Sequence, residues 1–143
     1  MAVKPAKFEF ETVADLDHLD EINSFIEMSL KELDIQDEHY GHICVSLDEA
    51  VTNVIMYAYP HKKENIKIAI EKLKGRVSIK IIDSGAPFNP LDHPTPDVSV
   101  KIEDRLVGGL GIHLMRNMMD ELNYHRIGDK NCFTLVKYIG GKK

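Results

Sequence analysis

Residues 65–82, NIKIAIEKLKGRVSIKII, alternate apolar and polar side chains in two runs separated by a short turn. A period of two is typical of a β-strand with one face toward the core, so each run predicts a strand. The Lys74-Gly75 step between the runs favours a tight antiparallel hairpin. The apolar positions are Ile66, Ile68, Ile70, Val77, Ile79 and Ile81.

Three helical patterns and three further alternating patterns surround this hairpin. Helices are predicted at residues 17–33, 39–58 and 110–122, and strands at 7–12, 122–127 and 132–139. Strands that are grouped mostly as hairpins, and separated from the helices, predict an α+β two-layer sandwich. We expect one mixed, mostly antiparallel sheet that is covered on one face by helices.

Residues 84–109 have neither helical nor strand periodicity. The segment contains four prolines and ends at the Gly108-Gly109 pair. A connection longer than about 15 residues inside a compact domain is usually a functional lid or a disordered stretch. We expect a lid.

The composition predicts one soluble domain spanning residues 1–143. There are 18 Lys and Arg against 23 Asp and Glu, which gives a net charge of −5. Binding to DNA or RNA requires a patch of basic residues, which a chain with this acidic balance lacks. Direct nucleic-acid binding is therefore not expected.

The sequence also predicts a cytoplasmic protein. No apolar run is long enough to span a bilayer, and residues 1–5 lack the apolar core of a signal peptide. Cys44 and Cys132 lie far apart among apolar neighbours, which predicts buried, reduced thiols.

Glu49 and Asn53 form the first candidate site, on the helix predicted at 39–58. They stand one turn apart and are expected to point away from the apolar face of that helix. An amide oxygen is a suitable ligand for Mg²⁺, and a nearby carboxylate can accept a hydroxyl proton. An ordinary solvated polar face explains the same pair.

Asp83-Ser84-Gly85 forms the second candidate site, where the second strand of the hairpin ends. A carboxylate there can accept a hydrogen bond from an exocyclic amine such as that of adenine, and glycine lets the backbone approach a ligand closely. A plain turn after a strand contains the same residue types.

Gly108-Gly109-Leu110-Gly111 forms the third candidate site, at the start of a predicted helix. Unobstructed amides at a helix start, together with the helix dipole, favour phosphate binding. The spacing matches neither the dinucleotide fingerprint nor the P-loop.

Together, and in this order, the three motifs resemble the ATP-binding boxes of the GHKL ATPase superfamily. Within that superfamily the chain is most similar to the anti-sigma factor serine/threonine kinases (RsbW-like). The resemblance covers nearly the whole chain, including the element order and the proline-rich lid.

The resemblance implies a role for each matched residue. Glu49 would be the general base that activates a serine hydroxyl, and Asn53 would hold the Mg²⁺ that bridges the phosphates of ATP. Asp83 would accept a hydrogen bond from the adenine amino group. The remaining residues implied in ATP binding are Gly85, Gly108, Gly109, Gly111, Thr134 and Arg105. For Arg105, a solvated lid charge is the simpler interpretation.

The resemblance also implies partners: an anti-anti-sigma protein with a STAS fold, an RNA polymerase sigma factor, and a second copy of the chain. No membrane partner is expected, and no metal other than nucleotide-bound Mg²⁺. Two positions depart from the superfamily pattern, since Pro87 replaces the second glycine of the Asp83 box and Tyr57 stands where histidine is common.

Two other functions stay open at this point. One is a nucleotide-dependent binding switch without kinase activity, which shares the boxes but would not need Glu49. The other is the catalytic part of a sensor histidine kinase, which is disfavoured because no dimerisation helix with a phosphoacceptor histidine precedes the domain.

Overall fold

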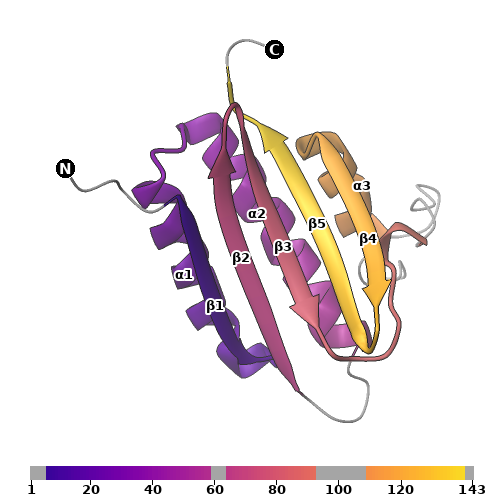
Figure 1. The fold of residues 1–143 in the computed structure, drawn as a ribbon. Coiled ribbons are helices and arrows are strands. Elements are labelled where there is room, and N and C mark those ends of the chain that lie inside the picture. The colour runs from indigo at the N-terminus through magenta and orange to yellow at the C-terminus, as the bar shows by residue number, and fades with distance from the viewer. Residues whose placement is uncertain (1–5, 59–63, 93–108, 141–143) are drawn as a thin grey trace.

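The computed structural model describes residues 6–58, 64–92 and 109–140, and Figure 1 shows five strands in one sheet with the helices behind it. The strands are β1 (Lys7–Val13), β2 (Asn65–Leu73), β3 (Arg76–Asp83), β4 (Glu121–Ile127) and β5 (Lys130–Tyr138). The helices are α1 (Leu19–Glu32), α2 (Asp37–Asn53) and α3 (Gly109–Met118). Shorter turns are η1 (Leu16–His18), η2 (Val54–Ala58) and η3 (Pro90–Asp92). The predicted α+β two-layer fold is confirmed.

The strands lie in the order β1-β2-β3-β5-β4, and each neighbouring pair of described strands is antiparallel. The expectation of a mixed sheet was therefore wrong for these strands. The reason is that β5 enters the sheet beside β3 and forms a hairpin with β4, so both of its neighbours run opposite to it.

The core lies between the sheet and the helices. Ile68 of β2 is opposite Ile81 of β3, which is opposite Phe133 of β5, and all three are almost fully buried. The period-two pattern of the hairpin thus places one row of apolar side chains against the helices. The other face of the sheet carries charged pairs such as Lys67 with Glu9.

The predicted helix at 110–122 was too long. α3 ends at Met118, and β4 begins at Glu121. The backbone amide of Asp120 already donates to the carbonyl of Val136 at 2.9 Å, so sheet pairing starts where the helical periodicity could still continue.

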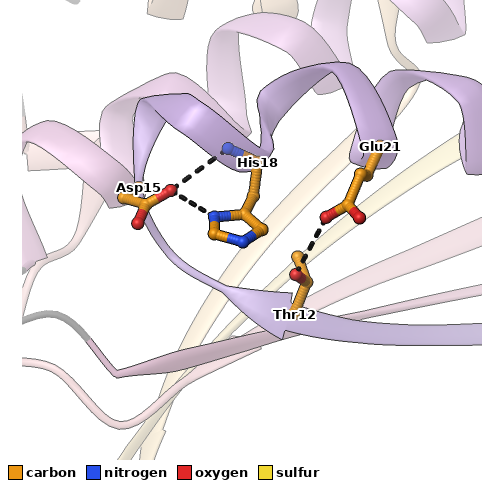
Figure 2. A network of polar contacts seen from close by, with 4 residues as sticks. All are labelled: Thr12, Asp15, His18 and Glu21. Carbon is orange, nitrogen blue, oxygen red and sulfur yellow. Dashed lines mark hydrogen bonds and ion pairs between the residues drawn. The ribbon is translucent and has the colours of Figure 1, made fainter.

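The start of the first helix is fixed by the short turn η1 (Figure 2). Asp15 caps this turn, because its Oδ1 accepts the backbone amide of His18 at 3.1 Å. The same oxygen lies 2.5 Å from Nδ1 of the His18 ring. Thr12 at the end of β1 donates to Glu21 on the first turns of α1 at 3.3 Å, which ties strand to helix.

The expected lid lies mostly outside the described residues, because 93–108 are not described. Its first part contains η3, a 3-10 turn that the absence of periodicity did not predict. The carbonyl of Leu91 in this turn accepts a hydrogen bond from Arg116 of α3 at 3.2 Å.

Both cysteines are free, as expected, but the prediction that they are buried was wrong. Cys44 and Cys132 are each partly exposed. Cys44 lines a groove between α1 and α2, and Cys132 lies on the face of the sheet that the helices leave open.

Candidate nucleotide-binding site

Asn53 is the last residue of α2 and is 1% exposed. The expectation that it points away from the core was wrong. The chain turns from α-helix into the π-helical turn η2 directly after Asn53, and α2 as a whole packs against α3. π-Helical turns frequently occur at functional sites.

The Asn53 amide has a buried nitrogen, Nδ2, without a hydrogen-bond partner among the described residues. A buried polar atom without a partner is costly, so it indicates a ligand that completes the site. Because a side-chain amide can rotate to exchange its oxygen and nitrogen, this position can offer an oxygen to a cation. Asn53 therefore fits the role of a Mg²⁺ ligand.

Glu49 lies one turn before Asn53 and is partly exposed. Burial raises the pKa of its carboxyl, and the neighbouring Asp48 carboxylate raises this pKa further. A carboxylate with a raised pKa binds a proton more readily, as a general base must.

Asp83 ends β3 and is 3% exposed. Its Oδ1 accepts the backbone amide of Gly85 at 2.8 Å and the side-chain amide of Asn131 at 2.9 Å. These two bonds fix the carboxylate and the turn that follows it. In Figure 1 the last turns of α2 lie at the same end of the molecule as the end of β3, so the Asn53 and Asp83 boxes share that end.

Asn131 is the centre of this hydrogen-bond network. Besides bonding to Asp83, its Nδ2 donates to the carbonyl of Ala86 at 2.8 Å. Its Oδ1 accepts from the amide of Phe88 at 3.3 Å and from the hydroxyl of Tyr124 at 2.5 Å. The side chain of Asn131 thus holds the backbone on both sides of Pro87.

Arg126 completes the network from β4. Its Nη1 donates to Oδ1 of Asn131 at 3.1 Å and to the carbonyl of Gly85 at 2.9 Å. Sequence reasoning missed Asn131, Tyr124 and Arg126. Asn131 was missed because asparagine is a common turn residue and this one stands next to a predicted turn. The signal that could have found it is the pairing of β3 with β5, which places Asn131 opposite Asp83.

Thr134 does not join these residues. It pairs with Lys80 and Asn123, whereas its neighbours Phe133 and Leu135 face the core. Since side chains alternate along a strand, Thr134 lies on the face of the sheet opposite to Asp83. The Thr134 assignment is corrected for this reason, and Asn131 takes its place on β5.

The glycine box is described in part. α3 begins at Gly109 and includes Gly111, so both stand in its first turn, where backbone amides are left without helical partners. Ile112 and Met115 on the next turn are buried in the core and anchor the helix. Gly108 and Arg105 lie outside the described residues.

Within the described ranges 6–58, 64–92 and 109–140, no group of three or more His, Cys, Asp or Glu is placed to hold a metal ion. None of the helices there combines the length and apolar character needed to cross a membrane.

A sheet covered by helices on one face, together with three boxes of this kind, defines an ATPase domain of the GHKL class. A family model described as "Histidine kinase-like ATPase domain" matches residues 12–137, and the chain belongs to this family. The predicted resemblance to the RsbW-like branch is confirmed by the relatives that follow.

Two curated relatives are similar to this chain in sequence, and one solved structure is similar to it in fold. The chain is 32% identical over 92 residues to the serine/threonine-protein kinase BtrW of Bordetella bronchiseptica, covering 64% of this chain and 65% of BtrW. It is 31% identical over 111 residues to the anti-sigma F factor of Caldanaerobacter subterraneus, covering 76% of this chain and 77% of that protein.

The solved structure contains the RsbU and RsbW domains of a Mycobacterium tuberculosis protein. It aligns with a TM-score of 0.68 over 93% of this chain and 32% of that chain, at 14% identity, which shows a shared fold.

Proposed function

We propose that this chain is an ATP-dependent serine protein kinase that also acts as an anti-sigma factor in the cytoplasm, with residues 1–143 forming one ATP-binding domain. The observation that carries the proposal is the buried amide of Asn53 one turn after Glu49, whose Nδ2 has no hydrogen-bond partner in the part of the chain that the structure describes. Two relatives support the same function, because one is named a serine/threonine-protein kinase and the other an anti-sigma F factor.

The residues divide the work of phosphoryl transfer. ATP would supply the phosphoryl group and leave as ADP, and Mg²⁺ would supply positive charge that offsets the charge of the phosphates. Glu49 accepts the proton of the serine hydroxyl as its oxygen takes the phosphoryl group, and Asn53 would hold the ion. The amides of Gly109 and Gly111 face the negative charge of the phosphates, which is electrostatic stabilisation by groups already in position.

Asp83 recognises the adenine amino group as a hydrogen-bond acceptor, and Gly85 leaves room for the base. Asn131 acts as a positioning residue, because it holds Asp83 and the backbone around Pro87. In this proposal, Gly108 and Arg105 also contact the phosphates of ATP.

The proposed partners are an anti-anti-sigma protein with a STAS fold and a sigma factor that the kinase sequesters. Phosphorylation adds about two negative charges to the STAS protein and releases it by repulsion. Bound nucleotide favours one partner over the other only through a difference in affinity between two conformations. A homodimer of the kinase belongs to the same proposal.

Thermal melting of the wild type and two variants tests the proposal. Mg-ATP at about a hundred times its dissociation constant should stabilise the wild type by about 2.7 kcal/mol, which is several degrees of melting temperature. Asn53→Ala should lose the Mg²⁺-dependent part of the shift. Glu49→Gln should keep the shift but lose phosphoryl transfer to a STAS protein.

The outcomes separate the alternatives. A chain that melts at one temperature with and without nucleotide does not bind ATP, and the proposal fails. A wild type that is stabilised by Mg-ATP, with no transfer to any STAS protein of its genome, is a nucleotide-dependent switch and not a kinase.

A further inference from the structure

Lys137 of β5 is a buried cation to which the nucleotide site described above gives no role. Its side chain is 8% exposed, and its Nζ donates to the carbonyl of Met118, the last residue of α3, at 2.5 Å. The last carbonyls of a helix have no partner within the helix, and a positive charge beside them complements the helix dipole. Lys137 therefore caps the end of α3 that is farthest from Gly109.

Two further hydrogen bonds hold the same end of α3 to β5. The backbone amide of Asp120, two residues after the helix, donates to the carbonyl of Val136 at 2.9 Å. The carboxylate of Asp120 accepts a hydrogen bond from the backbone amide of Tyr138 at 2.6 Å. Three consecutive residues of β5 thus determine where α3 ends.

The opposite end of α3 is the end proposed to bind phosphates. Gly109 and Gly111 have no side chains that could pack against the core, so their amides take their position from the rest of the helix. Ile112 and Met115 bury apolar side chains, but apolar burial is not directional, whereas a hydrogen bond defines an orientation. A helix of ten residues is only about 15 Å long, so a displacement at its last residue also moves its first turn.

The inner face of β5 links this helix end to the adenine end of the site. Side chains alternate along a strand, so Asn131, Phe133, Leu135 and Lys137 share the face toward the helices. Phe133 and Leu135 lie in the core, Asn131 at one end holds Asp83, and Lys137 at the other end holds α3. In Figure 1, β5 runs from the lower end of the sheet, where β3 ends, to the upper end, where β4 begins.

We propose that Lys137 is a positioning residue for the phosphates of ATP, because it sets the position of α3 along its axis and thereby the place of the Gly109 and Gly111 amides. This inference rests on the proposed binding of ATP. It adds a residue remote from the nucleotide that governs affinity for the phosphates and not for the adenine base.

Binding of Mg-ATP by calorimetry, and of adenosine by competition with ATP, tests the inference. Lys137→Met keeps the length of the side chain and removes its ammonium group. It should weaken Mg-ATP binding by about tenfold, because a shift of about 1 Å is enough to misalign the amides and the phosphates. Adenosine binding should change by less than about twofold, because Asn131 still holds Asp83.

Asp120→Ala is a second variant at the same end of α3, at an exposed position where folding is retained. It removes one of the three hydrogen bonds and leaves Lys137 in place. It should weaken Mg-ATP binding by about threefold and leave adenosine binding unchanged. If Lys137→Met does not fold, Asp120→Ala decides in its place.

Lys72→Met is the matched control. The Nζ of Lys72 donates to the carbonyl of Leu33 at 2.8 Å, where α1 ends, so this lysine makes the same kind of contact with a helix that has no proposed role in nucleotide binding. The variant should lower the melting temperature of the free protein, as Lys137→Met does. Its affinity for Mg-ATP should stay within about twofold of the wild type.

The outcomes distinguish this inference from the proposed function. If the wild type binds Mg-ATP and Lys137→Met binds it equally well, only the role of Lys137 is overturned. Equal losses of affinity for Mg-ATP and adenosine, or a similar loss in Lys72→Met, would show general damage to the fold and also overturn it. A wild type that does not bind Mg-ATP contradicts the proposed function itself.

Discussion

At the scale of single residues, Asn131 shows how a side chain that no motif marks can determine the geometry of a site. It contacts Asp83, Ala86 and Phe88, which belong to one box, from a strand about 45 residues further along the chain. Proline at position 87 removes the flexibility that a second glycine would provide. The side chain of Asn131 fixes the backbone on both sides of that proline.

Asn131→Ala should therefore destabilise the protein and weaken nucleotide binding together. The carbonyl of Ala86 and the amide of Phe88 lose a partner, and a buried polar group without a partner costs about 1–3 kcal/mol. We expect denaturant unfolding to show a loss of about 2–3 kcal/mol, and calorimetry to show weaker ATP binding.

Lys130→Ala is the control for Asn131→Ala. It removes only the exposed bond from Lys130 to Ser84, so stability should change by less than about 1 kcal/mol. Wild-type stability and ATP affinity in Asn131→Ala would mean that the network does not organise the site.

At the scale of elements, the entry into α1 depends on a titratable pair. Hydrogen bonding to Asp15 raises the pKa of His18 above 6.5, although partial burial opposes this. Hydrogen bonding to His18 lowers the pKa of Asp15 below 3.8, again against burial. Stabilisation by His18 is complete below pH 6.5 and is lost as the pH rises through its raised value. Stabilisation by Asp15 is complete above pH 3.8 and is lost as the pH falls through its lowered value.

The pair should therefore stabilise the protein most between pH 3.8 and 6.5. Compared with the wild type, His18→Gln should lower the melting temperature near pH 6, and the difference should shrink toward about pH 9, where both forms are neutral at this position. Equal differences at the two pH values would contradict a charged pair. Asp20→Asn, which removes a carboxylate from the first turn of α1, controls for general effects of charge.

Two glycines that have equal space around them should respond oppositely to alanine. A Cβ added at Gly41 or Gly75 meets no atom within 4 Å, but Gly75 has a φ of +76° in the β2–β3 turn. Gly75→Ala should cost about 1 kcal/mol, because a side chain disfavours that conformation. Gly41→Ala should stabilise α2 by about 0.5–1 kcal/mol, because alanine favours helix. Urea unfolding of both variants checks the signs, and the same sign in both would refute the argument.

At the scale of the whole molecule, the parts predicted correctly are those encoded by nearby residues. The hairpin of β2 and β3 follows from period-two alternation, and α1 and α2 follow from apolar residues at helical spacing. The motifs in the sequence also pointed to residues at the ends of elements: Glu49 and Asn53 lie in the last turns of α2, and Asp83 ends β3. The functional roles remain predictions for Glu49, Asn53, Asp83, Gly109 and Gly111.

The parts that were wrong or missed depend on contacts between distant segments. The burial of Asn53 depends on tertiary packing around the end of α2, which the helical pattern of the sequence does not contain. The face on which Thr134 lies and the role of Asn131 depend on the register between β3 and β5, which no local pattern contains. The end of α3 at Met118 likewise depends on where β4 joins β5.

The pairing of Asp83 with Asn131 also bears on how the protein is made. The β2–β3 hairpin needs only its own residues, whereas this contact joins positions 48 residues apart. Closing so long a stretch of chain costs entropy that a local hairpin avoids. During synthesis on the ribosome, the carboxylate of Asp83 therefore waits for its partner until β5 begins to emerge, and the β3–β5 pair is then completed from this end toward Arg76 and Tyr138.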